Sequence, residues 1–180
     1  MSRKRTSQGM TRRSFLRAAA VSAVAPAIVP SSIFSRPAPS DTLQFGCIGV
    51  GRQGQADMQE LIYRGLEAGA RVTAVCDIDS HRLDDAQWVA ENIYALETGK
   101  DAAKSVSAYR DFRDLLARKD LDGVLVVTPD FWHAAIGVAA AEAGKDIYLE
   151  KPLTYSIAEG RKLVEAVKKN KRVLQVGSQQ

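Results

Sequence analysis

A glycine-rich turn between an apolar run and an amphipathic segment most constrains the fold of this chain. Residues 43–49 have the pattern of a buried strand, and Gly49, Gly51 and Gly54 follow with the spacing G-x-G-x-x-G. A strand, a tight turn and a helix at this spacing are typical of a dinucleotide-binding unit. The first glycine permits the turn, the second leaves room for a pyrophosphate, and the third lets the helix pack against the strand. Backbone N–H groups of the first helical turn would then face the phosphates.

The same glycines also fit a purely structural turn, and the segments around them favour the dinucleotide interpretation. A strand pattern over residues 71–77 ends in Asp77, 23 positions after Gly54. A carboxylate at this place is expected to accept hydrogen bonds from the adenosine ribose, and a turn-initiating aspartate is the alternative. A carboxylate also repels a 2′-phosphate, so we expect NAD to be favoured over NADP, with Arg82 nearby as the residue that would soften this preference.

Strand and helix patterns alternate along the chain from Leu43 onward. We predict strands over residues 43–49, 71–77, 105–109, 123–128, 146–150 and 172–176, and helices over residues 53–68, 82–96, 112–118, 131–143 and 157–169. This alternation predicts an α/β fold, a Rossmann-type doubly wound parallel sheet of six strands in the order 3-2-1-4-5-6. Gly69 and Gly144 are expected to end helices, Asp111 to cap one, and Ser156 with Glu159 to form a capping box.

The first 40 residues differ in composition from the rest of the chain. They hold seven Lys or Arg residues and no acid, and Arg12-Arg13-Ser14-Phe15-Leu16 precedes a modest apolar stretch over residues 18–29. This layout resembles a twin-arginine export signal, followed by a linker over residues 30–40; a disordered basic arm is the alternative. Pro26 and Pro30 interrupt the apolar stretch, so we expect no stable membrane span and a periplasmic or other extracytoplasmic location.

The net charge of +4 comes from this leader. Without its seven basic residues, 18 of the 25 Lys and Arg remain against 21 Asp and Glu, so we expect no nucleic-acid partner. Cys47 and Cys76 both fall inside predicted strands, where two buried thiols are expected rather than a disulfide. His81 and His133 are isolated in the sequence, and no metal site is predicted.

Residues that follow the predicted strands should meet at one edge of the sheet, because ligands of such sheets bind beyond the carboxyl ends of the strands. These residues include Thr128-Pro129 with His133 four positions after the proline, Glu150-Lys151-Pro152, and Gly177-Ser178-Gln179. Together with the glycine turn, the first two motifs resemble the glucose–fructose oxidoreductase and inositol dehydrogenase family (Gfo/Idh/MocA). The resemblance covers residues 43–180, and Glu150-Lys151-Pro152 is its most specific motif.

The resemblance implies a nicotinamide cofactor in an N-terminal Rossmann domain, here residues 41–180, and hydride transfer with a sugar, polyol or related small molecule. It also implies a catalytic role for Lys151, whose cation beside the substrate hydroxyl would stabilise an alkoxide or polarise a carbonyl. Taken alone, a lysine is more often a solvated surface residue. Glu150 is expected to orient Lys151 or the cofactor.

Other candidates keep two interpretations. His133 is expected either to contact the nicotinamide side or to be a packed histidine, Trp132 to be a cleft wall or part of the core, and Arg52 to approach the pyrophosphate or stay in solvent. Thr128 and Pro129 are expected to line the cofactor cleft. The full set of expected cofactor contacts is Gly49, Gly51, Arg52, Gln53, Gly54, Asp77, Thr128, Pro129, His133, Glu150 and Lys151.

Members of this family continue into a second α/β domain that forms most of the substrate pocket and commonly the oligomer interface. No such domain is recognised in these 180 residues. We therefore expect a truncated form that binds nucleotide with little turnover, and a homo-oligomer only in a full-length form. An NAD-recycling glycosidase and a non-catalytic nucleotide-binding module are the alternatives; net consumption of NAD separates the first of these from an oxidoreductase.

Overall fold

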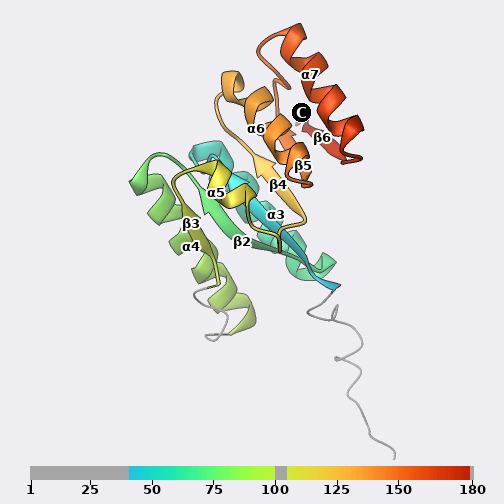
Figure 1. Cartoon of the computed structure of the whole chain (residues 1–180). Helices are drawn as coiled ribbons and strands as arrows, with labels where there is room; N and C mark the ends of the chain where they lie inside the picture. The colour runs from blue at the N-terminus through green and yellow to red at the C-terminus, as the bar shows by residue number, and fades with distance from the viewer. Residues whose placement is uncertain (1–40, 100–104, 179–180) are drawn as a thin grey trace, which may run out of the picture. The chain divides into compact units, whose positions relative to one another are not determined.

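Leu43–Ile48 forms strand β1 in the middle of a six-stranded sheet, in a computed structural model that describes residues 41–99 and 105–178 (Figure 1). The other strands are β2 (Ala70–Cys76), β3 (Ser107–Tyr109), β4 (Gly123–Val126), β5 (Asp146–Glu150) and β6 (Leu174–Gly177). The helices are α3 (Arg52–Ala68), α4 (Ser80–Thr98), α5 (Phe112–Leu116), α6 (Asp130–Glu142) and α7 (Ile157–Lys169). All strand pairs are parallel and the order is β3-β2-β1-β4-β5-β6, which confirms the predicted Rossmann topology.

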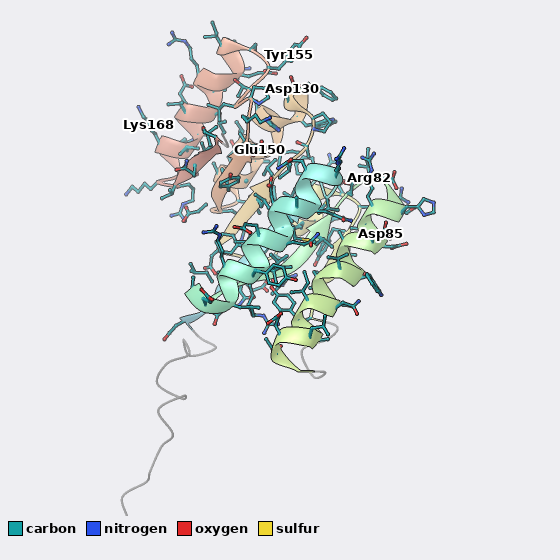
Figure 2. All side chains as sticks on the ribbon, turned by 180° about the vertical axis from the view of Figure 1, so that it is seen from behind. Arg82, Asp85, Asp130, Glu150, Tyr155 and Lys168 are labelled. Atoms are coloured by element: carbon teal, nitrogen blue, oxygen red, sulfur yellow. The ribbon has the colours of Figure 1, made fainter. Side chains whose placement is uncertain are left out.

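The central strands supply two hydrophobic cores, one on each face of the sheet. All four residues of β4 are buried: Val124 and Val126 belong to the core under α5, α6 and α7, and Leu125 belongs to the core under α3 and α4. Figure 1 shows α5 and α6 in front of the sheet, and Figure 2, seen from behind, shows α3 and α4. A strand buried on both faces needs apolar side chains at every position, which explains the continuous apolar run.

Local hydrogen bonds set the helix boundaries. Asp79 accepts hydrogen bonds from the His81 and Arg82 backbone N–H groups, so α4 begins earlier than predicted. Ser156 and Glu159 form the predicted capping box at the start of α7. Gly69 has a left-handed backbone with φ 75° and ends α3, as predicted.

Three predicted strand boundaries are wrong by two residues. β3 begins at Ser107 rather than at residue 105, and in the other two cases the residues lie beside the end of a neighbouring helix. β4 ends at Val126 rather than at residue 128, since Pro129 is already the N-cap of α6. β6 begins at Leu174 rather than at residue 172, because the Arg172 N–H still donates to the Val167 carbonyl in the turn that closes α7.

The two cysteines are free and buried, as predicted, and they lie in different cores. Desolvation by burial raises the pKa of the Cys76 thiol to about 12 and also raises the pKa of the Cys47 thiol. Both thiols are therefore protonated and act as small apolar side chains at neutral pH.

The predicted leader and linker, residues 1–40, lie outside the described residues, and so does Gln179. Within residues 41–99 and 105–178, no helix has the length and apolar character that a membrane crossing requires. The same residues contain no cluster of three or more His, Cys, Asp or Glu side chains suited to hold a metal ion.

Candidate functional site

The glycine turn joins the end of β1 to the start of α3. Gly49 has φ +82°, and a Cβ there would lie 2.5 Å from the Val127 carbonyl oxygen. A Cβ on Gly54 would overlap the Gly49 carbonyl oxygen. Packing within the protein therefore requires both glycines. Gly51 differs, because the nearest atom to its added Cβ would be a guanidinium nitrogen of Arg82 at 3.5 Å, an ordinary contact.

The N-terminus of α3 carries no side-chain cap. Gly51 is the N-cap residue and the first turn contains no acidic side chain. The N–H groups of this turn lack intrahelical acceptors and carry the positive end of the helix dipole. The Arg52 side chain is exposed, while the Gln53 amide donates to Asp57 Oδ1 at 2.8 Å along the same helix.

Asp57 and Glu150 place two carboxylates on the α3 side of the sheet. Desolvation by burial raises the pKa of the Asp57 carboxyl, the hydrogen bond from Gln53 lowers it, and the negative charge of Glu150 raises it further. Oδ2 of Asp57 is buried and has no hydrogen-bond partner among the described residues. The region next to Glu150 therefore disfavours additional negative charge.

Asp77 fastens the glycine turn to the segment after β2. It is 9% exposed, its Oδ2 accepts the Val50 N–H at 2.9 Å, and its Oδ1 accepts the Asp79 N–H at 3.0 Å. The second of these contacts is the geometry of a turn-initiating aspartate. Each carboxylate oxygen has a further lone-pair site, so the same side chain retains the capacity to accept hydroxyl hydrogen bonds.

A cleft of about 380 Å³ opens at the carboxyl ends of β1, β2 and β4. Of the predicted contact residues, it is lined by Gly49, Gly51, Asp77, Thr128 and Pro129. The remaining candidates lie outside its lining: Arg52, Gln53, Gly54, His133, Glu150 and Lys151. The structure thus divides the predicted set among the cleft, the first turn of α3 and a group near the end of β5 that consists of His133, Glu150 and Lys151.

Several cleft residues were not predicted from the sequence. They include Ile78, Arg110, Asp111, Phe112, Arg113, Phe131 and Ile136. Residues 110–113 directly follow β3, the one strand whose carboxyl end contributed no predicted site residue. The rule that ligands bind beyond strand ends would have found them.

The walls of the cleft are apolar and its rim is cationic. Trp132 packs edge-on against Phe112, with ring centroids 6.4 Å apart, and Ile78 is 81% exposed. Arg110 donates to the Ile78 carbonyl at 3.1 Å, and Arg82 lies at the start of α4 (Figure 2). Flat apolar walls beside guanidinium groups suit a ligand with an aromatic base and phosphates.

Thr128, beside this cleft, has an unsatisfied hydroxyl. Its Oγ1 is buried and has no hydrogen-bond partner within the part of the chain that the structure describes, and the residue lines the cleft. Leaving such a group unpaired costs about 1–3 kcal/mol. The hydroxyl, the uncapped helix and the absence of a side chain at Gly51 fit a hydroxyl-rich, phosphorylated ligand.

The end of β5 carries the second group. Glu150 is 3% exposed and its Oε2 accepts the Lys151 N–H at 3.0 Å. The Lys151 side chain is exposed and the Lys151–Pro152 peptide bond is cis. Figure 2 shows Glu150 toward the same end of the sheet as Arg82 and Asp130. An exposed ammonium on a fixed backbone can reach a molecule that lies above this edge.

His133 adopts the packed arrangement that the sequence left open. It is 1% exposed; its Nδ1 lies 2.7 Å from the Pro152 carbonyl oxygen and its Nε2 lies 2.8 Å from the Thr128 carbonyl oxygen. Each ring nitrogen thus lies within hydrogen-bond distance of a backbone carbonyl oxygen.

Comparison with known proteins gives concordant results. A model of the oxidoreductase family with an NAD-binding Rossmann fold, Gfo/Idh/MocA, matches residues 43–178. An inositol 2-dehydrogenase from Salmonella typhimurium is 35% identical over 137 residues, which are 76% of this chain and 37% of that protein. A glycosyl hydrolase family 109 protein from Shewanella is 33% identical over 181 residues, 91% of this chain and 38% of that protein.

Among solved structures, the WlbA dehydrogenase from Chromobacterium violaceum in complex with NADH and UDP-GlcNAcA has a TM-score of 0.63 and 25% identity. The match covers 79% of this chain and 36% of that one. The chain therefore spans well under half the length of the relatives that it matches.

Proposed function

This chain belongs to the Gfo/Idh/MocA oxidoreductase family, and from that premise we propose that residues 41–180 bind NAD(H) for hydride transfer to or from a sugar or polyol. The observation that carries the proposal is the cleft itself, which is lined by Gly51 at the uncapped start of α3 and by Thr128, whose hydroxyl has no partner among the described residues. Bound NAD would supply the hydride acceptor; the residues of this chain bind and orient it.

Each part of the cleft has one role in this proposal. The N–H groups of the first turn of α3 hold the phosphates, with Arg52 at their edge. Asp77 accepts the adenosine ribose hydroxyls, and the Thr128 hydroxyl pairs with the cofactor beyond the end of β4. Apolar walls from Ile78 and Trp132 exclude water from the base.

Lys151 is the proposed catalytic residue. Its exposed ammonium, on a backbone held by Glu150, would polarise a substrate carbonyl that accepts the hydride, and would stabilise the same oxygen as an alkoxide when the hydride moves in the opposite direction. A sugar or polyol substrate is inferred from the inositol 2-dehydrogenase relatives.

Nucleotide titration tests the proposal and the choice of cofactor. We expect calorimetry on the 180-residue chain to give tighter binding of NADH than of NADPH, because the Asp77 carboxylate repels a 2′-phosphate. Asp77→Ala should weaken NADH binding, whereas Asp85→Ala, which removes an exposed carboxylate of α4 outside the cleft lining, should not. Preference for NADPH would overturn the NAD assignment alone. Absence of all nucleotide binding to a folded chain would favour a non-catalytic interaction module.

A second candidate, an NAD-recycling glycosidase, is supported by the extent of one match. The family 109 glycosyl hydrolase aligns over 91% of this chain, and residues 41–180 alone cannot account for that share. Such an enzyme would return its cofactor to the starting state in every cycle. A full-length form that cleaves a glycoside without net NADH formation would favour this candidate; stoichiometric NADH formation would exclude it.

Export by the twin-arginine route is a further part of the proposal, based on Arg12-Arg13 and the apolar stretch behind them. This route carries folded proteins, so the cofactor could be bound before export. Arg12→Lys with Arg13→Lys should retain a reporter fused to residues 1–40 in the cytoplasm, and Arg3→Lys with Arg5→Lys should not. Export of both variants would contradict the proposal.

A further inference from the structure

The imidazole of His133 joins two loops that leave different strands. Thr128 follows β4 and Pro152 follows β5, and the ring lies between their carbonyl oxygens at 2.8 Å and 2.7 Å. His133 itself sits in the first turn of α6 and is almost fully buried. It does not line the cleft, so its contacts are with the protein.

The chemistry of these contacts is that of a bridge. Carbonyl oxygens only accept hydrogen bonds, so an imidazole with both nitrogens protonated donates to both loops, and a neutral ring donates to one of them. Because the ring is rigid and buried, its two nitrogens fix the separation of the two carbonyl groups.

Each bridged loop carries a residue of the proposed site. Thr128, whose carbonyl contacts His133, carries the buried Oγ1 that has no partner among the described residues, and Pro152 directly follows Lys151. The Lys151 backbone is thus held on one side by Glu150, which accepts its N–H, and on the other by His133, which holds the next carbonyl.

We propose that His133 is a positioning residue that sets the Lys151 loop against the Thr128 loop and so shapes the half of the site that receives the nicotinamide riboside. This inference rests on the proposed NAD(H) function. It assigns the glycine turn and Asp77 to the adenosine diphosphate half, which His133 does not touch.

Comparison of NADH with ADP tests this division. ADP retains the adenosine and the two phosphates but lacks the nicotinamide riboside. His133→Gln should raise the Kd for NADH about tenfold, since it loses one of two bridging bonds, and change the Kd for ADP less than about twofold. Ala140→Gly, which weakens the same helix away from both loops, should leave the Kd for NADH and the Kd for ADP unchanged. If His133→Gln weakens the binding of NADH and ADP equally, or weakens the binding of neither, the inference is overturned.

Hydrogen exchange gives a readout that needs no nucleotide. His133→Gln should speed exchange of the amides of residues 150–155, while those of β1 and β2 stay protected as in the original chain. Uniform acceleration across the chain would mean that His133 only stabilises the fold, and would overturn the inference. If neither NADH nor ADP binds the original chain, the proposed function fails, and this exchange pattern still decides whether the bridge exists.

The original chain provides a check that does not depend on a folded variant. Ring N–H protons of His133 that donate to carbonyl groups should be visible by NMR and protected from exchange with solvent. Rapidly exchanging ring protons would overturn the bridge.

Discussion

At the scale of single residues, Gly51 and Gly54 have different reasons to be glycine. A Cβ at residue 54 would overlap a backbone oxygen of the same turn, whereas a Cβ at residue 51 would meet only the flexible end of Arg82. Packing therefore explains Gly54 completely and leaves Gly51 unexplained. A ligand that approaches the backbone at Gly51 accounts for the difference.

Alanine at each position separates the two effects. We expect Gly54→Ala to lower the free energy of unfolding by about 2–3 kcal/mol, as overpacking typically does, and Gly51→Ala by less than about 1 kcal/mol. Gly51→Ala should still weaken NADH binding at least about tenfold, because its Cβ occupies the approach to the helix N-terminus. Urea unfolding and calorimetry measure both quantities. A Gly51→Ala chain that binds NADH normally would contradict a phosphate site there.

Thr128 allows a second test at this scale. Thr128→Val keeps the shape of the side chain and removes a buried, unpaired hydroxyl, so the free energy of unfolding should stay constant or rise by up to about 1 kcal/mol. NADH binding should weaken at the same time, since the ligand loses its partner. Thr128→Ser, which keeps the hydroxyl, is the control for binding. A valine variant that is both destabilised and fully competent to bind would disprove the role of the hydroxyl.

At the scale of elements, helix ends connect stability with the cleft. The short helix α5 begins at Asp111, whose carboxylate caps it through the Arg113 N–H at 2.9 Å. The same carboxylate pairs with the Arg113 guanidinium at 2.6 Å. Both residues line the cleft. The cap therefore orders the part of the rim that follows β3.

Acid titration should reveal this cap. Hydrogen bonds from the Arg113 side chain, and then from its backbone N–H, lower the pKa of the Asp111 carboxyl from 3.8 to about 2. The stabilisation of α5 by the charged cap is thus complete above pH 3.8 and is lost as the pH falls toward 2. Carboxyl NMR should show a midpoint at about 2 that rises in Arg113→Gln and not in Lys119→Gln. An unchanged midpoint in Arg113→Gln would refute the pairing.

At the scale of the whole molecule, the two cores share one sheet. β1 and β4 are hydrogen-bonded to each other, and each contributes residues to both cores. Loss of either core exposes the other face of the same strands. The described residues, 41–99 and 105–178, should therefore unfold in a single cooperative transition.

The two tryptophans report on this coupling, because Trp88 lies on α4 and Trp132 on α6, at opposite faces of the sheet. Trp88→Phe and Trp132→Phe each leave one tryptophan. In each variant, the urea midpoint from the fluorescence of that tryptophan should agree with the midpoint from far-UV circular dichroism. Leu163→Ala, which removes a buried side chain under α7, should shift both fluorescence midpoints together at a cost of about 2–5 kcal/mol. Separate midpoints for the two tryptophans would show that the faces unfold independently.

The order of strands and helices, the parallel topology and the caps at Asp111 and Ser156 were predictable from the sequence. These features depend on hydrophobic periodicity and on contacts between residues a few positions apart, and both can be recognised in the amino-acid sequence. The glycine turn and Asp77 were predictable for a similar reason, because a strand end and a helix start locate them.

Tertiary structure alone decided how these pieces meet. The Asp77 carboxylate accepts a hydrogen bond from the Val50 N–H, 27 positions earlier in the sequence. His133 contacts the carbonyl oxygens of Thr128, 5 positions before it, and of Pro152, 19 positions after it. From the sequence, His133 could either contact a ligand or pack inside the protein. Its neighbours in the sequence do not indicate which carbonyl groups lie next to the imidazole in the folded chain. Residues from separate strands become neighbours only when the sheet order aligns their carboxyl ends, and side-chain packing then fixes which atoms touch.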